Sequence, residues 1–221
     1  MSLVDSPPFV PDSLTDIASA NEHFDRFPHY EAALEWITDF VLAPDPRLQR
    51  PGAVCPRLAS TIDRNQVWLV TVATTIGRVE ESVQTALMLA DLFDELVTAD
   101  DDFRRGALLA VFPDLAPSSA AEFIDDGHAR VRPDFVRRGL MLGEFHPASS
   151  VGSVHNPTFP VMASPVPMFA VRALTPHDIL FLDQPGPNRE QLLGWWLDRV
   201  GGRASTAAVD HVQRALTATG R

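Results

Sequence analysis

The sequence predicts a single α+β domain with an α/β-like core: one four-stranded sheet flanked by helices, with a pair of helices at its C-terminal end. Four short apolar runs rich in β-branched and aromatic residues alternate with longer stretches whose apolar residues recur at helical spacing. The chain has 221 residues, 45% of them hydrophobic, which suffices for one well-packed core. No low-complexity linker divides it. The predicted organisation is therefore an irregular N-terminal arm over residues 1–28 and one domain over residues 29–221.

The first part of the chain is predicted to be irregular and then helical. Prolines, aspartates and serines fill residues 1–28, with one short helix opened by the S-x-x-D pattern at residues 13–16. Apolar residues then follow helical spacing over residues 30–41, and two prolines shortly after this segment end the helix. Residues 47–63 contain Pro-Gly and Cys-Pro, which predicts a loop.

Four strands are predicted, at residues 67–73, 107–112, 140–145 and 168–174. A long amphipathic helix separates the first two, and an acidic turn follows it at residues 100–102. The order strand, helix, strand, helix, strand predicts parallel neighbours joined by right-handed crossovers, with the fourth strand at an edge or antiparallel.

The remaining helices are predicted from their capping patterns. A capping box at Ser119-x-x-Glu122 opens the helix before the third strand, and Pro133 interrupts or restarts that helix. The pattern from Asn188 to Gln191 opens the first C-terminal helix. A Gly-Gly pair separates it from the last helix, which runs to about residue 217.

Charge and composition exclude several classes of function. The formal net charge is −11, from 29 acidic against 18 basic residues, so binding to nucleic-acid phosphates is not expected. Neither a signal peptide nor an apolar stretch long enough for a membrane span is recognisable, which predicts a cytoplasmic protein with no membrane partner. All basic residues are arginine, so no lysine is available for a Schiff base or a P-loop.

The common catalytic motifs are missing from the sequence. It has no G-x-G-x-x-G, no G-x-S-x-G and no H-E-x-x-H pattern, which disfavours dinucleotide binding, the α/β-hydrolase elbow and zincin chemistry. Uncommon residues are instead concentrated in two segments, residues 50–56 and 143–172.

Cys55, the one cysteine of the chain, lies in the segment R-P-G-A-V-C-P. Its thiolate is a candidate nucleophile, soft-metal ligand or axial haem ligand. A buried cysteine that packs as a small hydrophobe is the alternative interpretation.

Glu144, His146 and His155 form the second group of candidates. Alternation along the third strand puts Glu144 on the face of Leu140 and Leu142, at the strand end where α/β sheets commonly bind ligands. The long irregular loop at residues 147–165 is able to bring His155 back to this end. The three side chains are candidate ligands for non-haem iron or zinc, with a purely structural role for both histidines as the alternative.

Arg172 stands between apolar residues in the fourth strand and therefore needs a partner. Glu144 is the structural partner that we predict. The functional alternative is that Arg172 binds a carboxylate of the substrate.

Four patterns together resemble an uncharacterised bacterial family of unknown function that is often found in specialised-metabolism settings. They are R-P-G-x-V-C-P, G-x-x-x-G-E-F-H-P, H-N-P-x-F and S-P-x-P-x-x-A-x-R. This resemblance spans roughly residues 30–182 and implies no established activity.

The order of elements, together with Val111-Phe112-Pro113-Asp114 and Gly143-Glu144, also resembles the YqcI/YcgG family. The chain has Cys-Pro where that family has Pro-Cys. Of that family's His-x-x-Arg-x-Ser-Arg cluster it offers only His155 and the distant Arg172. The YqcI/YcgG family includes haem-dependent enzymes that N-hydroxylate amino-acid guanidines. The resemblance therefore implies a haem monooxygenase acting on a small amino-acid-like substrate.

On this interpretation Cys55, His146 or His155 holds the haem iron, Arg172 binds a carboxylate of the substrate, and Glu144 pairs with Arg172 or relays protons. The alternatives are a non-haem iron or zinc enzyme that uses Glu144, His146 and His155, and a non-catalytic accessory protein that binds a small molecule or a protein partner. A homo-oligomer or a redox partner is left open.

Overall fold

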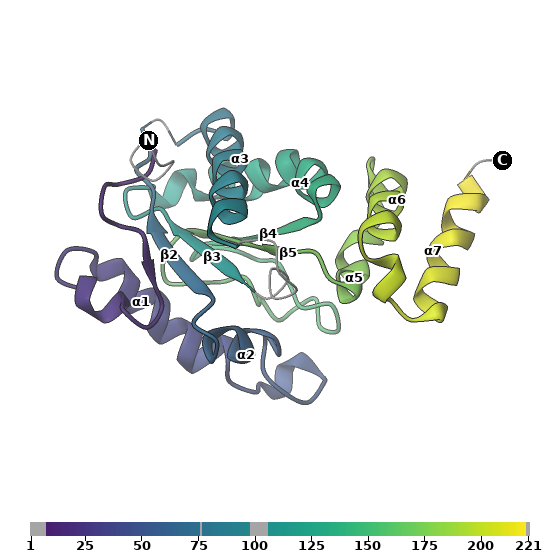
Figure 1. Ribbon diagram of the computed structural model, residues 1–221, viewed down its shortest axis with the longest axis horizontal. Helices are drawn as coiled ribbons and strands as arrows, with labels where there is room; N and C mark the ends of the chain where they lie inside the picture. Colours follow the sequence, from purple (N-terminus) through teal and green to yellow (C-terminus); the bar gives the residue numbers. More distant parts are fainter. Residues whose placement is uncertain (1–7, 76, 98–105, 220–221) are drawn as a thin grey trace.

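The computed structural model describes residues 8–75, 77–97 and 106–219, and these form one mixed sheet with helices on both faces (Figure 1). The α+β class predicted from the sequence is confirmed. The strands are β1 (Thr15–Asp16), β2 (Val67–Thr71), β3 (Ala107–Val111), β4 (Leu140–Phe145) and β5 (Met168–Ala173). The four predicted strands are all present with ends close to those expected, and the two-residue strand β1 adds a fifth.

The sheet has the order β1-β2-β3-β5-β4, in which β2 and β3 are parallel. β5 runs antiparallel to both β3 and β4. The fourth predicted strand, β5, was expected to lie at an edge or to be antiparallel. It is antiparallel and lies inside the sheet, with β4 at the edge. The chain returns from β4 to β5 through a loop, and such a return pairs strands antiparallel because parallel pairing needs a crossover to the far end.

Seven α-helices are present within the described residues. They are α1 (Pro28–Trp36), α2 (Leu58–Ile62), α3 (Val79–Leu96), α4 (Gly127–Arg138), α5 (Ile179–Leu182), α6 (Arg189–Val200) and α7 (Thr206–Thr219). Two π-helical turns adjoin them: η3 (Ile37–Val41) continues α1, and η7 (Ala121–Asp126) leads into α4. Short 3₁₀ turns lie at Ala20–His23, Pro46–Leu48, Pro117–Ser119, Pro176–Asp178 and Gly201–Arg203. No helix in these ranges is long and apolar enough to cross a membrane.

Several local predictions need correction. The segment at residues 13–16 contributes strand β1 instead of a helix. Helix α4 continues through Pro133, which neither interrupts nor restarts it. The predicted capping hydrogen bonds at the starts of η7 and α6 are not formed. The predicted loop at residues 47–63 contains the short helix α2, and the acidic turn at residues 100–102 lies outside the described residues.

Helices α3 and α4 cover one face of the sheet, α1 and α2 cover the other, and α5 to α7 extend beyond the β4–β5 side (Figure 1). Each face has its own apolar core. Phe93, Phe135 and Phe169 belong to the core under α3 and α4, whereas Tyr30 and Leu69 belong to the core under α1. Successive residues of one strand therefore point alternately into the core under α3 and α4 and into the core under α1.

Candidate functional site

Strand β4 directs Glu144 towards helix α4. Leu140 and Leu142 of the strand lie in the same apolar core as Phe135 of α4, and strand alternation places Glu144 on their face. The next residue, Phe145, points to the opposite face, where its ring lies edge-on to Trp36 at 5.4 Å between centroids. The two faces predicted for this strand from the sequence are confirmed.

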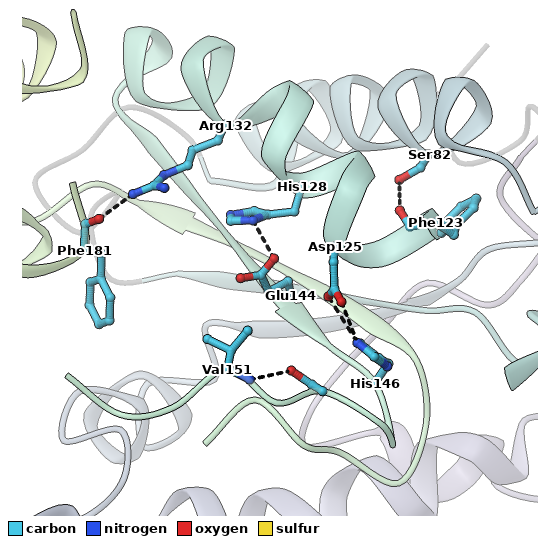
Figure 2. A network of polar contacts seen from close by, with 10 residues as sticks. Ser82, Phe123, Asp125, His128, Arg132, Glu144, His146, Val151 and Phe181 are labelled. Carbon is cyan, nitrogen blue, oxygen red and sulfur yellow. Dashed lines mark hydrogen bonds and ion pairs between the residues drawn. The ribbon is translucent and has the colours of Figure 1, made fainter. Parts of the chain in front are cut away.

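Two imidazole–carboxylate pairs join the end of β4 to the start of α4 (Figure 2). Nδ1 of His128 lies 2.6 Å from Oε2 of Glu144, and Nε2 of His146 lies 3.1 Å from both carboxylate oxygens of Asp125. Asp125 and His128 are three residues apart on a helical segment, and Glu144 and His146 are two residues apart on extended chain. Both spacings put side chains on one face at about 5–7 Å, so the two pairs lie side by side.

His146 is held on both its side chain and its backbone. Only 2% of its side chain is exposed, and Nδ1 is buried without a hydrogen-bond partner in the described structure. Its carbonyl oxygen accepts hydrogen bonds from the amides of Ser149 (3.0 Å) and Ser164 (3.4 Å). The imidazole faces Asp125 and is closed to solvent, while the carbonyl oxygen of His146 holds both ends of the long loop at residues 147–165.

Arg132 lies one turn along α4 from His128. One terminal nitrogen donates to the carbonyl oxygen of Phe181 at 2.5 Å, and Nε is buried without a partner in the described structure (Figure 2). Burial lowers the pKa of Arg132, and the charge of Glu144 offsets this lowering only in part. The group at this strand end thus holds two acids, two imidazoles and one guanidinium.

Arg172 does not pair with Glu144, which corrects the sequence prediction. Glu144 lies opposite Phe169 in the β4–β5 register, and Arg172 is three residues further along β5. Odd spacing puts the two side chains on opposite faces of the sheet. Arg172 instead binds Asp178 with both terminal nitrogens, at 2.8 and 2.6 Å.

The Arg172–Asp178 pair is largely buried on the Asp178 side, where 3% of the side chain is exposed, against 34% for Arg172. Burial alone would raise the pKa of Asp178, but the hydrogen bonds and charge of Arg172 outweigh it and hold this pKa below its ordinary value. The same carboxylate accepts from the amide of Thr175. Arg172 therefore serves the turn that follows β5.

Cys55 and His155 lie apart from the imidazole–carboxylate pairs. Cys55 is half-buried and packs against the core under α1. His155 is exposed in the long loop and makes no hydrogen bond with any described residue. Within residues 8–75, 77–97 and 106–219 no three His, Cys, Asp or Glu side chains gather in a way suited to a metal ion. The metal ligands predicted from the sequence thus stay a prediction.

A shallow groove of about 530 Å³ lies on the α1 face, next to the end of β4. One wall is formed by the last turns of α1 and by η3, the other by the long loop. The first wall includes Glu35, Trp36, Asp39 and Phe40, and the second includes Pro147 and Ser164. Pro147 follows His146 in the chain, and the amide of Ser164 donates to the carbonyl oxygen of His146. The backbone of His146 therefore lies between this groove and the imidazole–carboxylate pairs.

A row of aromatic rings runs along the groove and its surroundings. Trp36 and Phe40 stack at 5.9 Å, and Phe40 meets Phe159 of the loop edge-on at 6.0 Å. The guanidinium of Arg47 lies over the ring of Phe159, 4.2 Å from its centroid. Asn156 also donates to the carbonyl oxygen of Arg47, so the two segments flanking the groove are tied together.

The groove was not predicted from the sequence, because the helical spacing of residues 30–41 indicates only the stripe that faces the core. A signal was present: Trp36 and Phe40 are bulky aromatics outside that stripe, and Glu35 and Asp39 repeat the same spacing beside them. Two carboxylates four residues apart on a helix repel each other and destabilise it. Such a pair without a basic residue beside it is therefore a signal of a binding surface. His128, Asp125 and Arg132 were also missed, because their relevance depends on which helix covers the end of β4.

Fold and site together define an α+β protein with a small-molecule-sized groove beside an ionisable strand end. Residues 30–211 match the family described as domain of unknown function DUF6875, and because this match covers most of the chain, the protein belongs to that family. No match was found among curated proteins or among solved structures.

Proposed function

We propose that the protein is a haem-dependent monooxygenase that N-oxygenates a small amino-acid-like molecule bound in the groove, as a step of specialised metabolism. The groove is the observation that carries this proposal. Its size suits a small molecule, and its loop wall, which includes Pro147 and Ser164, belongs to residues 143–172, one of the two segments in which uncommon residues are concentrated. The resemblance to the YqcI/YcgG family supplies the reaction class.

Among the three candidate iron ligands, His155 is the one that supports the haem proposal best. Its imidazole is exposed and makes no hydrogen bond with any described residue, so it can bind iron without breaking a contact. His146 is a poor ligand, since its ring is buried and holds Asp125. Cys55 is half-buried and packs against the core under α1, so its thiol is less open to a haem than the imidazole of His155. Bound haem would supply dioxygen activation.

The reaction incorporates one oxygen atom of O₂ into an N–H bond and reduces the other to water. Two electrons and two protons from a redox partner complete the balance. Glu144, paired with His128, is then a positioning residue that holds the strand end through its helix contact. Arg172 is committed to Asp178, so we assign it no contact with the substrate.

A non-catalytic binding protein is the second candidate, and the open, shallow form of the groove favours it. Such a protein would bind a small molecule at the same place without a cofactor. The two candidates differ in one measurable property, the presence of haem.

The test is a visible absorption spectrum with a pyridine haemochrome assay on protein expressed with iron and a haem precursor. We expect a Soret band at near-stoichiometric haem. His155→Ala should abolish or shift this band, whereas His177→Ala, at another exposed histidine, should leave it unchanged.

Protein without a Soret band would remove the haem proposal and leave the binding protein. A band that is the same in His155→Ala as in the wild type, but altered in His146→Ala or Cys55→Ala, would keep the haem and contradict His155 as its ligand.

A further inference from the structure

The groove has an electrostatic and aromatic character that specifies its ligand. Glu35 and Asp39 lie on its rim, both exposed, and neither makes an ion pair with any described residue. Two like charges at this helical spacing destabilise the helix modestly. A positive charge placed between them would turn this repulsion into attraction.

The groove's wall also offers a surface that attracts cations. Trp36 and Phe40, both partly exposed, stack against each other, and each directly follows one of the two acids in the sequence. The face of an aromatic ring attracts an organic cation through its quadrupole, and tryptophan does so most strongly. No cationic side chain is among the residues that line the groove.

The protein itself provides a precedent at one end of the aromatic row. The guanidinium of Arg47 lies 4.2 Å from the ring centroid of Phe159, and Phe159 adjoins Phe40. An organic cation is therefore already accommodated against this row, immediately beyond the groove.

We propose that the groove between η3 and the long loop binds a small organic cation, an amine or guanidine, through Glu35, Asp39 and the Trp36–Phe40 stack. This inference rests on the proposed function for the location of the site and adds the charge class of the ligand. The cation would lie over the rings with its charge directed to the carboxylates. Because the site is open, the charge contribution falls as salt rises.

Binding is measured by calorimetry and by tryptophan fluorescence with three probes: agmatine, cadaverine and choline. Glutarate, an anion of similar size, is the control ligand. We expect the cations to bind and glutarate not to bind. Comparison of the three cations tells a guanidinium preference from an ammonium one.

Variants separate charge from shape. Glu35→Gln and Asp39→Asn should each weaken binding about three- to fivefold, as expected for an exposed charge pair. Trp36→Leu should weaken it about tenfold through loss of the cation–π contact. Glu31→Gln is the matched control, since Glu31 is an exposed acid of the same helix that does not line the groove.

Glutarate binding as tight as that of the cations, or no binding of any cation, would overturn the inference. So would Glu31→Gln weakening binding as much as Glu35→Gln. A dimer in light scattering that dissociates in the Glu35→Gln, Asp39→Asn double variant would show that the cation is an arginine of a second copy, which also overturns the small-molecule ligand.

The outcome is independent of the haem experiment. Cation binding by protein without a Soret band leaves this inference standing and removes the oxygenase. A Soret band without cation binding supports the oxygenase and overturns this inference.

Discussion

At the scale of single residues, the face of the sheet to which a charged side chain points determines which residue it pairs with. Arg172 and Glu144 lie on adjacent strands, yet on opposite faces of the sheet. Arg172 therefore pairs with Asp178 in the turn that follows β5, whereas Glu144 pairs with His128 of α4, the helix that covers its own face. The consequence for Arg172 can be measured.

Asp178→Asn should destabilise the protein at neutral pH by about 1.5–3 kcal/mol, the range for a hydrogen bond to a charged group. A third of the Arg172 side chain remains in solvent, so the loss should stay below that for a fully buried pair. The pKa of Asp178 is lowered in the folded state, so its contribution is complete above the unfolded pKa of about 4 and is lost as pH falls through the folded value. Urea unfolding should thus show a stability gap between wild type and variant that narrows below about pH 4.

The matched control is Asp12→Asn, which removes the exposed ion pair with Arg26 and should leave stability unchanged. A gap for Asp178→Asn that is independent of pH would mean that the carboxylate contributes through shape and not through its charge.

At the scale of elements, the sequence predicts the strands better than it predicts their arrangement. Residues 67–71, 107–111, 140–145 and 168–173 are apolar runs whose local pattern identifies them. The two-residue strand β1 and the five-residue helix α2 are too short to show any periodicity. The position of β5 between β3 and β4 depends on long-range pairing, which no local pattern contains.

The same distinction between local patterns and long-range contacts applies to the candidate site. The face and strand-end position of Glu144 follow from alternation, so both were predicted correctly. Its partner His128 depends on the packing of α4 over β4, and the groove beside Trp36 depends on how the long loop returns to α1. Both are tertiary contacts, and no local pattern in the sequence predicts them.

Close packing of α3 against the segment entering α4 makes Gly127 indispensable. A Cβ at this position would lie 2.0 Å from Oγ and 2.7 Å from Cβ of Ser82, whose hydroxyl donates to the carbonyl oxygen of Phe123 at 2.5 Å. Gly127→Ala should therefore destabilise the protein by about 1–3 kcal/mol, as overpacking does. In the Ser82→Gly background the same substitution should cost clearly less, and a double-mutant cycle by urea unfolding measures the difference.

Gly194→Ala in α6 is the control, because a Cβ there meets nothing within 4 Å. It should be neutral or stabilise by up to about 1 kcal/mol through helix propensity. Equal costs of Gly127→Ala in both backgrounds would show that the clash with Ser82 is not the cause.

At the scale of the whole molecule, the N-terminal arm belongs to the folded body although the family match begins only at residue 30. The arm forms strand β1 beside β2, and the amide of Ile17 donates to the carbonyl oxygen of Val67 at 2.8 Å. Phe9 joins the core under α3, while Phe27 joins the core under α1. The arm thus wraps the β2 edge and reaches both faces of the sheet.

A further tie holds the arm to α1 and β2. The hydroxyl of Tyr30 donates to the carbonyl oxygen of Ser13 at 2.7 Å and accepts from Thr71 at 2.9 Å. Burial raises the pKa of Tyr30 to about 12, although hydrogen bonds to Thr71 and Ser13 act in the opposite direction, so this hydroxyl stays protonated. Removal of the arm would leave this buried network without one of its acceptors.

A chain that lacks residues 1–27 should therefore not fold stably. Burial of two phenylalanines contributes about 3–6 kcal/mol, which is a large part of the roughly 5–15 kcal/mol that stabilises a typical domain. The bare edge of β2 would also expose unpaired backbone groups and favour aggregation. Circular dichroism melting with light scattering should show a weak or absent cooperative transition, and addition of a peptide of residues 1–27 should restore it by mass action. A truncated chain that melts as the full chain does would instead place all stabilising contacts within the family-matched region, and the arm would then be an accessory covering of the β2 edge.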